Sequence, residues 1–239
     1  MTYTLTYSTI DKGDPKCLQR EKFDNYMNSF WERGNQIQTN ISNYEALVDI
    51  KADNLFYASR NFFAMAMYNA FSMATIWLAA FFSHSNSASV YNFLNFCEQN
   101  QKSIFTKEFY QEKVNVPNSK VKLEMGKFSE ILKECRRLLD DNADLIEKLI
   151  FNRNKIFAHF EKEFLIKHKI QLTITIDDLK YLIKLAEEIV NNIWCYYDRT
   201  YRTFSPLDIL DLQQTIDIVD GFVKNKQTIT QLKNDGVLL

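Results

Sequence analysis

The chain has 239 residues, of which 46% are hydrophobic, and its 29 basic and 30 acidic residues leave a formal net charge of −1. This near balance excludes a global basic field, so a contact with nucleic acid would have to use a local basic patch. The chain holds only 5 glycines and 3 prolines. Because sheet proteins need many tight turns, this scarcity predicts an all-α protein of long helices joined by few loops.

The 4 cysteines and 3 histidines are scattered along the chain and include no Cys-x-x-Cys pair. This spacing is not that of a zinc site, and we expect neither a metal nor another cofactor. Each cysteine lies in an apolar pattern of helical spacing, which favours buried, reduced thiols and a cytoplasmic location. The N-terminus is polar and alternating, so no signal peptide is predicted.

The N-terminal region predicts an extended arm followed by two long helices. Apolar side chains alternate with threonines over residues 2–10, a spacing typical of a short strand or an extended arm, which we place over residues 1–15. Helical patterns then cover residues 16–38 and 42–82, the second with a break near residues 49–53.

The segment Phe62–Phe82 contains no charged residue and is long enough to span a membrane. A helix that is apolar nearly all round is also what the centre of a soluble bundle requires, so we favour a core helix and expect no membrane. Four polar residues fall on one side of this helix: Tyr68, Asn69, Ser72 and Thr75. They would make interhelical hydrogen bonds or line a cleft opposite Arg153.

The remainder of the chain alternates between helical patterns and polar connections. We expect helices over residues 87–97, 105–112, 121–139, 144–159 and 177–197, and a last one that opens at Ser205-Pro206. Ser87 or Ser89 would cap the first of these and Asp177 the fifth. The aromatic segment Trp194–Tyr197 would stack bases or, as we favour, close a helix in the core. Residues 16–225 are predicted to form a single helical domain, followed by a polar tail over residues 226–239.

One charged residue interrupts the apolar stripe of the helix that begins at Asp144. Six apolar side chains share an arc of roughly 140° at about 100° per residue: Leu145, Ile146, Leu149, Ile150, Ile156 and Phe157. Arg153 projects near the middle of that arc, and Asn152 and His159 lie at its margin. A guanidinium on an apolar face is costly unless it is paired, so Arg153 marks an interface or a functional site.

The segment Asn152–His159 resembles the Arg-x(4–6)-His motif of the HEPN superfamily. Arg153 is followed by Asn154, at a position where HEPN proteins commonly carry Asn, Asp or His, and then by His159 at the required spacing. The pattern RNKhhAH, with h apolar, is most similar to the AbiU-type, abortive-infection branch. The resemblance covers approximately residues 42–201 and implies an all-α, HEPN-like helical bundle behind the short N-terminal arm.

The resemblance implies a metal-independent ribonuclease of the toxin-like or antiphage kind. It would act on RNA as a homodimer, with an antitoxin or another protein as a further partner. His159 would be the general base or acid at the 2′-hydroxyl, because a neutral imidazole accepts a proton near pH 7. Arg153 would stabilise the charge that builds on the phosphorane, and Asn154 would orient one of these groups or the scissile phosphate. Lys155 and Asn152 would contact the RNA.

Helix geometry favours a site shared by two copies. On a regular helix Arg153 and His159 project roughly 120° apart, whereas a two-fold axis would bring each arginine near the partner's histidine. Two other interpretations stay open. Arg153 would pair with Glu147 or Glu187, and His159 would cap its helix, as purely structural features. Alternatively, the chain would be a catalytically inactive HEPN module that binds RNA, a nucleotide or a protein partner.

Overall fold

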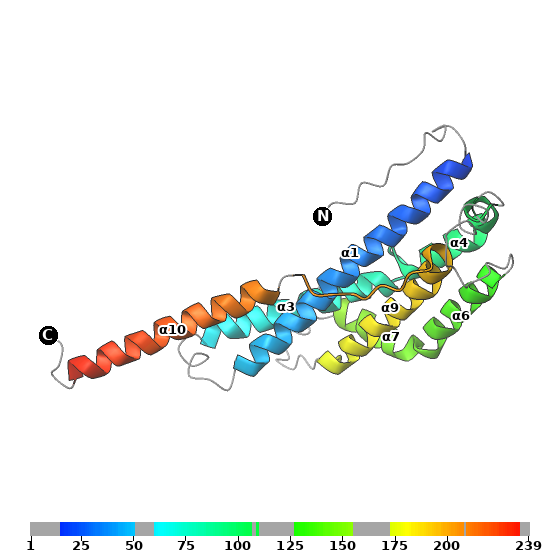
Figure 1. Ribbon diagram of the computed structural model, residues 1–239. Coiled ribbons are helices and arrows are strands. Elements are labelled where there is room, and N and C mark those ends of the chain that lie inside the picture. Colours follow the sequence, from blue (N-terminus) through cyan, green and yellow to red (C-terminus); the bar gives the residue numbers. More distant parts are fainter. Residues whose placement is uncertain are drawn as a thin grey trace. The chain divides into compact units, whose positions relative to one another are not determined.

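The computed structural model describes residues 15–50, 60–106, 109, 127–154, 173–207 and 209–234, and within these residues it contains helices and no strand. The predicted all-α class is confirmed. Figure 1 shows the helices in chain order: α1 (Pro15–Ile50), α3 (Arg60–Phe82), α4 (Val90–Ile104), α6 (Lys127–Asp141), α7 (Ala143–Asn152), α9 (Ile176–Asp198) and α10 (Ile209–Asn234). Of the arm predicted over residues 1–15, only Pro15 lies within the described residues, and it begins α1, a position that suits proline.

Helix α1 continues through residues 39–41, where the sequence pattern predicted a connection between two helices. Polar side chains in this stretch hydrogen-bond to carbonyls one turn earlier; Thr39 Oγ1, for example, donates to Asn35 O over 2.8 Å. Because these side chains bond within the helix, their polarity does not end it. The predicted connection was therefore wrong, but α1 ends at Ile50, within the break predicted near residues 49–53.

The last helix begins later than predicted. α10 starts at Ile209, not at Ser205-Pro206, and extends into the predicted polar tail. The late start has a cause in the backbone, because Ser205 N donates to Asn35 Oδ1 over 2.9 Å. Leu207 N likewise donates to Thr39 Oγ1 over 2.7 Å. These bonds to side chains of α1 hold the preceding segment out of the helix.

Contacts divide the chain into two compact units, each built from three separate stretches. Unit 1 comprises Met1–Glu32, Ala80–Ile146 and Leu185–Thr203, and unit 2 comprises Arg33–Ala79, Glu147–Lys184 and Phe204–Leu239. The boundaries fall inside α1, α3, α7 and α9, so segments distant in sequence meet within each unit. The single domain over residues 16–225 stays a prediction.

Unit 1 has an aromatic core. The ring centroid of Phe23 in α1 lies 5.4 Å from that of Phe93 in α4 and 4.7 Å from that of Tyr197 in α9. Trp194 and Tyr196 are also buried, each 7% exposed. The aromatic end of α9 is therefore part of the core, which confirms the favoured interpretation over base stacking.

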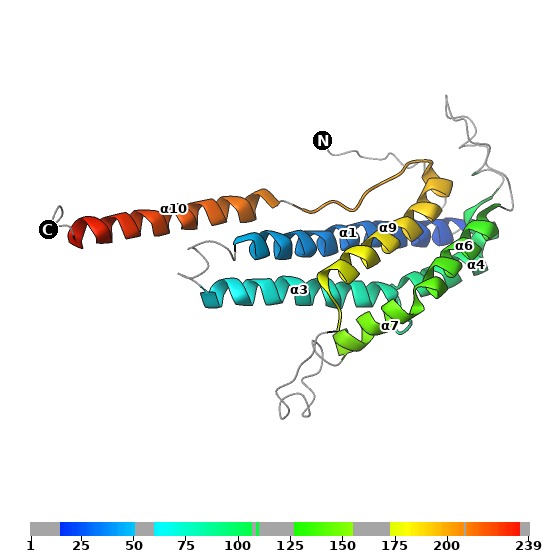
Figure 2. The same cartoon turned by 90° about the horizontal axis from the view of Figure 1, so that it is seen from below.

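Helices α4 and α6 of unit 1 lie side by side in both ribbon views (Figures 1 and 2). Arg136 of α6 donates from Nε to Glu98 Oε1 over 2.6 Å and from Nη2 to Glu98 Oε2 over 2.9 Å, so one bidentate pair joins the two helices. The N-cap of α4 is Ser89, whose side chain accepts a hydrogen bond from Asn92 N over 3.3 Å. Of the two predicted caps, Ser89 is thus the one used.

In unit 2, the C-terminal half of α1 and the N-terminal half of α3 run side by side (Figure 2), with the ring centroids of Tyr44 and Phe71 5.5 Å apart. An ion pair of 2.6 Å between Lys180 Nζ and Glu45 Oε1 joins the start of α9 to α1. Buried Phe204 packs so closely on Gly34 that a Cβ there would overlap the ring. Only glycine leaves room for this approach.

Two residues of the polar stripe of α3 hydrogen-bond within their own helix. Ser72 Oγ donates to Tyr68 O over 2.7 Å, and Thr75 Oγ1 donates to Phe71 O over 2.9 Å. Both hydroxyls are thus satisfied by carbonyls of their own helix, one turn earlier. Both predicted roles for the stripe are therefore wrong for these two residues.

Helix α3 is long and apolar enough over Asn61–Phe82 to cross a membrane by length and composition alone, and 44% of the tested window is buried within the protein. Its C-terminal half carries fully buried residues such as Ala74 and Leu78, while Phe62 and Met65 near its start are each 59% exposed. Burial of that half is what a core helix shows, and one such helix gives only weak support for a membrane span.

Three cysteines are free thiols in the described chain: Cys97, Cys135 and Cys195. Cys97 and Cys135 are fully buried. Burial raises the pKa of the Cys97 thiol well above its ordinary value and that of Cys135 to about 12. Thiols in this state are structural rather than nucleophilic. The prediction of buried cysteines is confirmed for Cys97 and Cys135, whereas Cys195 is only partly buried.

Candidate functional site

The candidate site lies at the end of α7, within unit 2. The α-helix ends at Asn152, and Arg153 and Asn154 continue it as a wider, π-helical turn. Such turns are rare and occur frequently at functional sites. The regular spacing of about 3.6 residues per turn that was assumed in projecting Arg153 therefore does not continue past Asn152.

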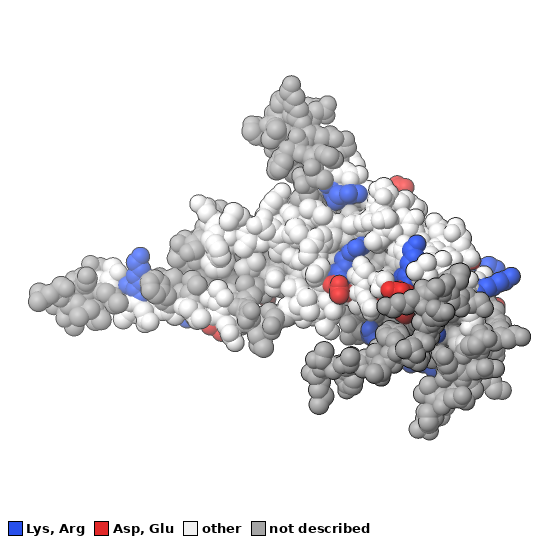
Figure 3. Space-filling model, turned by 90° about the horizontal axis from the view of Figure 1, so that it is seen from above, with Lys and Arg blue, Asp and Glu red and all other residues white. Residues whose placement is uncertain are grey.

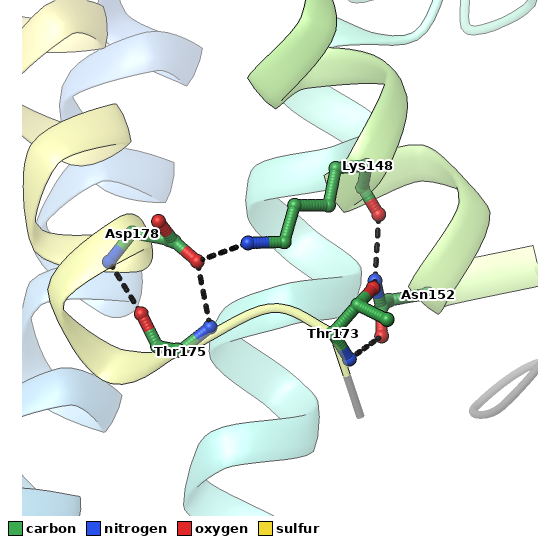
Figure 4. Close-up of polar contacts among 5 residues, drawn as sticks. All are labelled: Lys148, Asn152, Thr173, Thr175 and Asp178. Atoms are coloured by element: carbon green, nitrogen blue, oxygen red, sulfur yellow. Dashed lines mark hydrogen bonds and ion pairs between the residues drawn. The ribbon is translucent and has the colours of Figure 1, made fainter. Parts of the chain in front are cut away.

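Asn152 anchors the end of α7. Its side chain is completely buried, and Figure 4 shows it directed toward Thr173, which precedes α9. Asn152 Nδ2 donates to Lys148 O and to Thr173 Oγ1, each over 2.7 Å, while Thr173 N donates to Asn152 Oδ1 over 3.2 Å. The amide thus uses both its nitrogen and its oxygen inside the protein. We call this pairing of Asn152 and Thr173 the amide clamp.

A second anchor lies one helical turn earlier. Lys148 Nζ donates to Asp178 Oδ2 over 2.8 Å (Figure 4). Asp178 also closes a reciprocal cap with Thr175: Thr175 N donates to Asp178 Oδ2 over 2.9 Å, and Asp178 N donates to Thr175 Oγ1 over 3.1 Å. This is a capping box with Asp in place of the usual Glu or Gln. The cap of α9 is therefore Thr175, and the prediction of Asp177 was wrong.

The Asp178 carboxylate is held in its charged form. Partial burial disfavours the charge, but the hydrogen bonds from Lys148 and Thr175 outweigh that cost, so the pKa of Asp178 lies below its ordinary value. The ion pair joins α7 to α9 next to the amide clamp. Together the two anchors fix the backbone immediately before Arg153.

Arg153 follows the amide clamp directly. Its side chain is half-buried, and its Nε is buried without a hydrogen-bond partner in the described part of the chain. Glu147, one of the two predicted partners, forms no ion pair with it there. The other, Glu187, accepts a hydrogen bond from Tyr201 within unit 1. A buried donor without an acceptor is costly, which makes Arg153 Nε an unusual feature of the described chain.

The other predicted site residues fall into two groups. Asn154 lies beside Arg153 and is half-buried, whereas Lys155 and His159 lie outside the described residues, so their roles stay predictions. The side chain of Asn152 is completely buried and its amide is bonded internally, and its predicted contact with RNA stays a prediction. Asn152, Arg153 and Asn154 are consecutive and lie in one turn at the end of α7.

Four residues that the sequence analysis did not assign support the site: Lys148, Thr173, Thr175 and Asp178. The spacing of Thr175 and Asp178 is that of a capping box, so this pair was readable from the sequence. The amide clamp was not, because it joins Asn152 to a residue that is distant in sequence.

The described residues elsewhere show neither a large basic patch on the face drawn in Figure 3 nor a group of metal ligands. On the face drawn in Figure 3, the described Lys and Arg side chains stand as separate spots, some of them next to acidic side chains. Within the same described residues, no group of three or more His, Cys, Asp or Glu side chains has a geometry that could hold a metal ion. An interaction with RNA would therefore depend on individual arginines and lysines at defined positions.

Comparison with protein families decides the assignment. A family model described as AbiU2, of the HEPN type, matches residues 20–215. The chain belongs to the AbiU2 family of HEPN proteins. No curated protein and no solved structure matches it. The matched range extends the predicted resemblance at both ends and contains Arg153, Asn154, Lys155 and His159, so the AbiU2 family match includes the whole candidate motif.

Proposed function

We propose that this AbiU2-family protein is a metal-independent endoribonuclease whose site is completed by two copies of the chain. The observation that carries the proposal is Arg153, a cation with a buried, unpartnered donor, held at the end of α7 by the amide clamp. Its place in an Arg-x(4–6)-His motif within an AbiU2-family chain supports the same interpretation.

The motif residues would divide the chemistry of RNA cleavage. His159 takes the proton of the 2′-hydroxyl, whose oxygen then attacks the adjacent phosphorus. Arg153 stabilises the negative charge of the phosphorane with its guanidinium donors. The bond to the 5′-oxygen breaks, and that oxygen leaves with a proton from water. The products are a 2′,3′-cyclic phosphate and a 5′-hydroxyl.

Asn154 and Lys155 would bind the phosphate that is cleaved and its neighbours. Asn154, next to Arg153 in the π-helical turn, supplies an amide donor, and Lys155 supplies a point charge for the backbone. Asn152 acts through Arg153 by holding its backbone in place.

The proposed setting is that of a toxin-like or antiphage ribonuclease in the cytoplasm. RNA is the substrate, a second copy of the chain completes the site, and an antitoxin or another protein restrains the activity. A homodimer is required by this proposal, because the arginine of one copy works with the histidine of the other.

RNA cleavage in EDTA tests the proposal, with wild type compared with Arg153→Ala and His159→Ala on total cellular RNA. Arg137→Ala is the matched control, since Arg137 is an exposed arginine whose ion pairs lie within α6. We expect wild type and Arg137→Ala to cut and the two motif variants to lose at least about a hundredfold in rate. Circular dichroism confirms that all four proteins fold alike.

Two outcomes would contradict the assignment. Variants that cut as fast as wild type would remove Arg153 and His159 from the site. A wild type that binds RNA but leaves it intact would instead identify an inactive HEPN module that binds RNA.

A further inference from the structure

The turn that follows α9 carries two arginines and lies in unit 1, away in sequence from the HEPN motif. We call residues Arg199–Arg202 the arginine turn. All three guanidinium nitrogens of Arg199, Nε, Nη1 and Nη2, are buried and have no hydrogen-bond partner within the described chain. A buried guanidinium without an acceptor is among the costliest arrangements in a protein. No described residue therefore supplies an acceptor for the guanidinium of Arg199.

The backbone of Arg199 is also unusual. Its φ is 60°, and no other described non-glycine residue has a positive φ. Its N–H donates to Cys195 O over 3.0 Å, which makes Arg199 the left-handed residue that terminates α9. Glycine or asparagine adopts this conformation at lower cost. Strain of this kind is retained most often where a side chain has a function.

Arg202 is held in a defined position. Its guanidinium carbon lies 4.0 Å from the ring centroid of Trp194 and 5.7 Å from that of Trp31. Its backbone is fixed by buried Asn191, which donates to Arg202 O over 2.7 Å and accepts from Arg202 N over 3.0 Å. A guanidinium stacked in this way still has its N–H edge available for a bidentate contact with a phosphate.

The acidic neighbours of the turn are engaged by neutral hydroxyl groups. Asp198 Oδ2 accepts from Thr200 Oγ1 over 3.0 Å, and Glu187 Oε1 accepts from Tyr201 OH over 3.3 Å. The ring of Tyr201, between the two arginines, is 65% exposed. An exposed ring beside cations is an arrangement on which a nucleic-acid base can stack.

We propose that the arginine turn binds a phosphate group through Arg199 and Arg202. The stacked Arg202 makes the first, exposed contact. The Arg199 guanidinium, which is buried in the absence of a ligand, then turns outward so that its donors meet the acceptor oxygens of the phosphate. The phosphate is part of a single-stranded nucleic acid, in which case Tyr201 stacks on a base, or it is a free phosphate. The site is separate from the proposed cleavage chemistry and does not depend on it.

Binding of a labelled single-stranded DNA of about eight nucleotides tests the proposal, measured by fluorescence anisotropy at a series of salt concentrations. DNA lacks the 2′-hydroxyl, so the result does not depend on ribonuclease activity. Inorganic phosphate is tested in parallel, by its effect on the thermal unfolding midpoint. The variants are Arg202→Ala, Arg202→Lys, Arg199→Asn and Tyr201→Ala. Arg137→Ala is the control, because it removes the same charge from an exposed site of unit 1.

We expect Arg202→Ala and Arg199→Asn each to weaken DNA binding by about tenfold, the effect of removing one charge-assisted hydrogen bond. The slope of log affinity against log salt should fall by about 0.7 for each phosphate that the variant no longer neutralises. Arg202→Lys keeps the charge but not the planar fork, so its affinity should lie between wild type and Arg202→Ala. Tyr201→Ala should weaken DNA binding and leave the effect of phosphate unchanged.

Comparing the effects of single-stranded DNA and inorganic phosphate identifies the source of the phosphate group. If inorganic phosphate raises the unfolding midpoint of wild type and not of Arg199→Asn, while DNA does not bind, the site takes a free phosphate. The proposal is wrong if neither ligand acts on wild type, or if both arginine variants behave like Arg137→Ala.

Discussion

The ends of α7 and α9 solve the same problem in different ways. Each places an arginine just past the last residue of a helix, where a cation is favoured by the helix dipole, and each leaves guanidinium nitrogen buried without a partner in the described chain. At the end of α7, the amide clamp holds Arg153 from outside the helix. At the end of α9, the chain itself turns through the left-handed conformation of Arg199.

The two helix ends differ in how much stability it costs to hold an arginine whose side chain is unpaired. The amide clamp costs little and adds stability, because every polar atom of Asn152 is satisfied. The turn at Arg199 adds backbone strain to the cost of the unpaired guanidinium. Loss of the clamp should therefore destabilise the protein, whereas loss of the Arg199 side chain should stabilise it.

The largest expected effect is on activity and tests whether the α7 site is shared between copies. Arg153→Ala and His159→Ala are each expected to be inactive. An equal mixture of the two should regain about a quarter of wild-type activity, because half of the dimers are mixed and each mixed dimer holds one intact site. Refolding the two variants together before the cleavage assay ensures exchange.

A mixture that stays inactive after verified exchange would show that each site uses the arginine and histidine of one chain. Mixing Arg153→Ala with Asn154→Ala serves as the control, since Arg153 and Asn154 are adjacent in one turn and would be lost from the same side of a shared site.

The next effect is on stability at the amide clamp. Asn152→Ala removes a completely buried amide together with its hydrogen bonds to Lys148 and to exposed Thr173, so the free energy of unfolding should fall by about 2–3 kcal/mol. Urea unfolding measures the change. Asn154→Ala, two residues further on and half-buried, is the matched control and should change stability by less than about 0.5 kcal/mol. Equal effects would mean that the clamp contributes nothing specific.

At the end of α9 the sign should be opposite. Arg199→Asn relieves the backbone strain and removes an unpaired guanidinium, so the free energy of unfolding should rise by about 1 kcal/mol in phosphate-free buffer. Arg137→Ala, measured alongside, should change it little because exposed ion pairs contribute little. A loss of stability in Arg199→Asn would contradict the contrast between the two helix ends.

The sequence predicted the features that depend on local pattern. Few glycines and prolines predicted helices, and Arg153 was visible because it interrupts an apolar stripe. The Ser89 cap, one of the two candidates, was equally local. The family motif added the expected roles of His159 and Asn154, which periodicity alone does not supply.

Features that depend on tertiary contacts escaped the sequence. The start of α10 is delayed by side chains of α1, Asn35 and Thr39, which are far away in the chain. The sequence shows Asn152 as a polar residue at the margin of a helix, but its hydrogen bond to Thr173 could not be predicted from the local pattern. Nothing in the residue type of Arg199 signals a left-handed conformation, because arginine rarely adopts it.

The smallest expected effect is a pH dependence that belongs to the α7 anchor alone. The folded-state pKa of Asp178 is lowered, so its contribution to stability is present above the ordinary carboxyl value of about 3.9 and is lost as pH falls through the lowered value. Stability measured by urea unfolding between about pH 6 and pH 2 should thus fall more in wild type than in Asp178→Asn, by less than about 1 kcal/mol.

Lys148→Met should also reduce this pH dependence, because Lys148 helps to hold the Asp178 charge. If Lys148→Met instead keeps the wild-type pH profile, the charge is held by the Thr175 cap alone. The junction of α7 with α9 would then rest on the amide clamp and not on the ion pair.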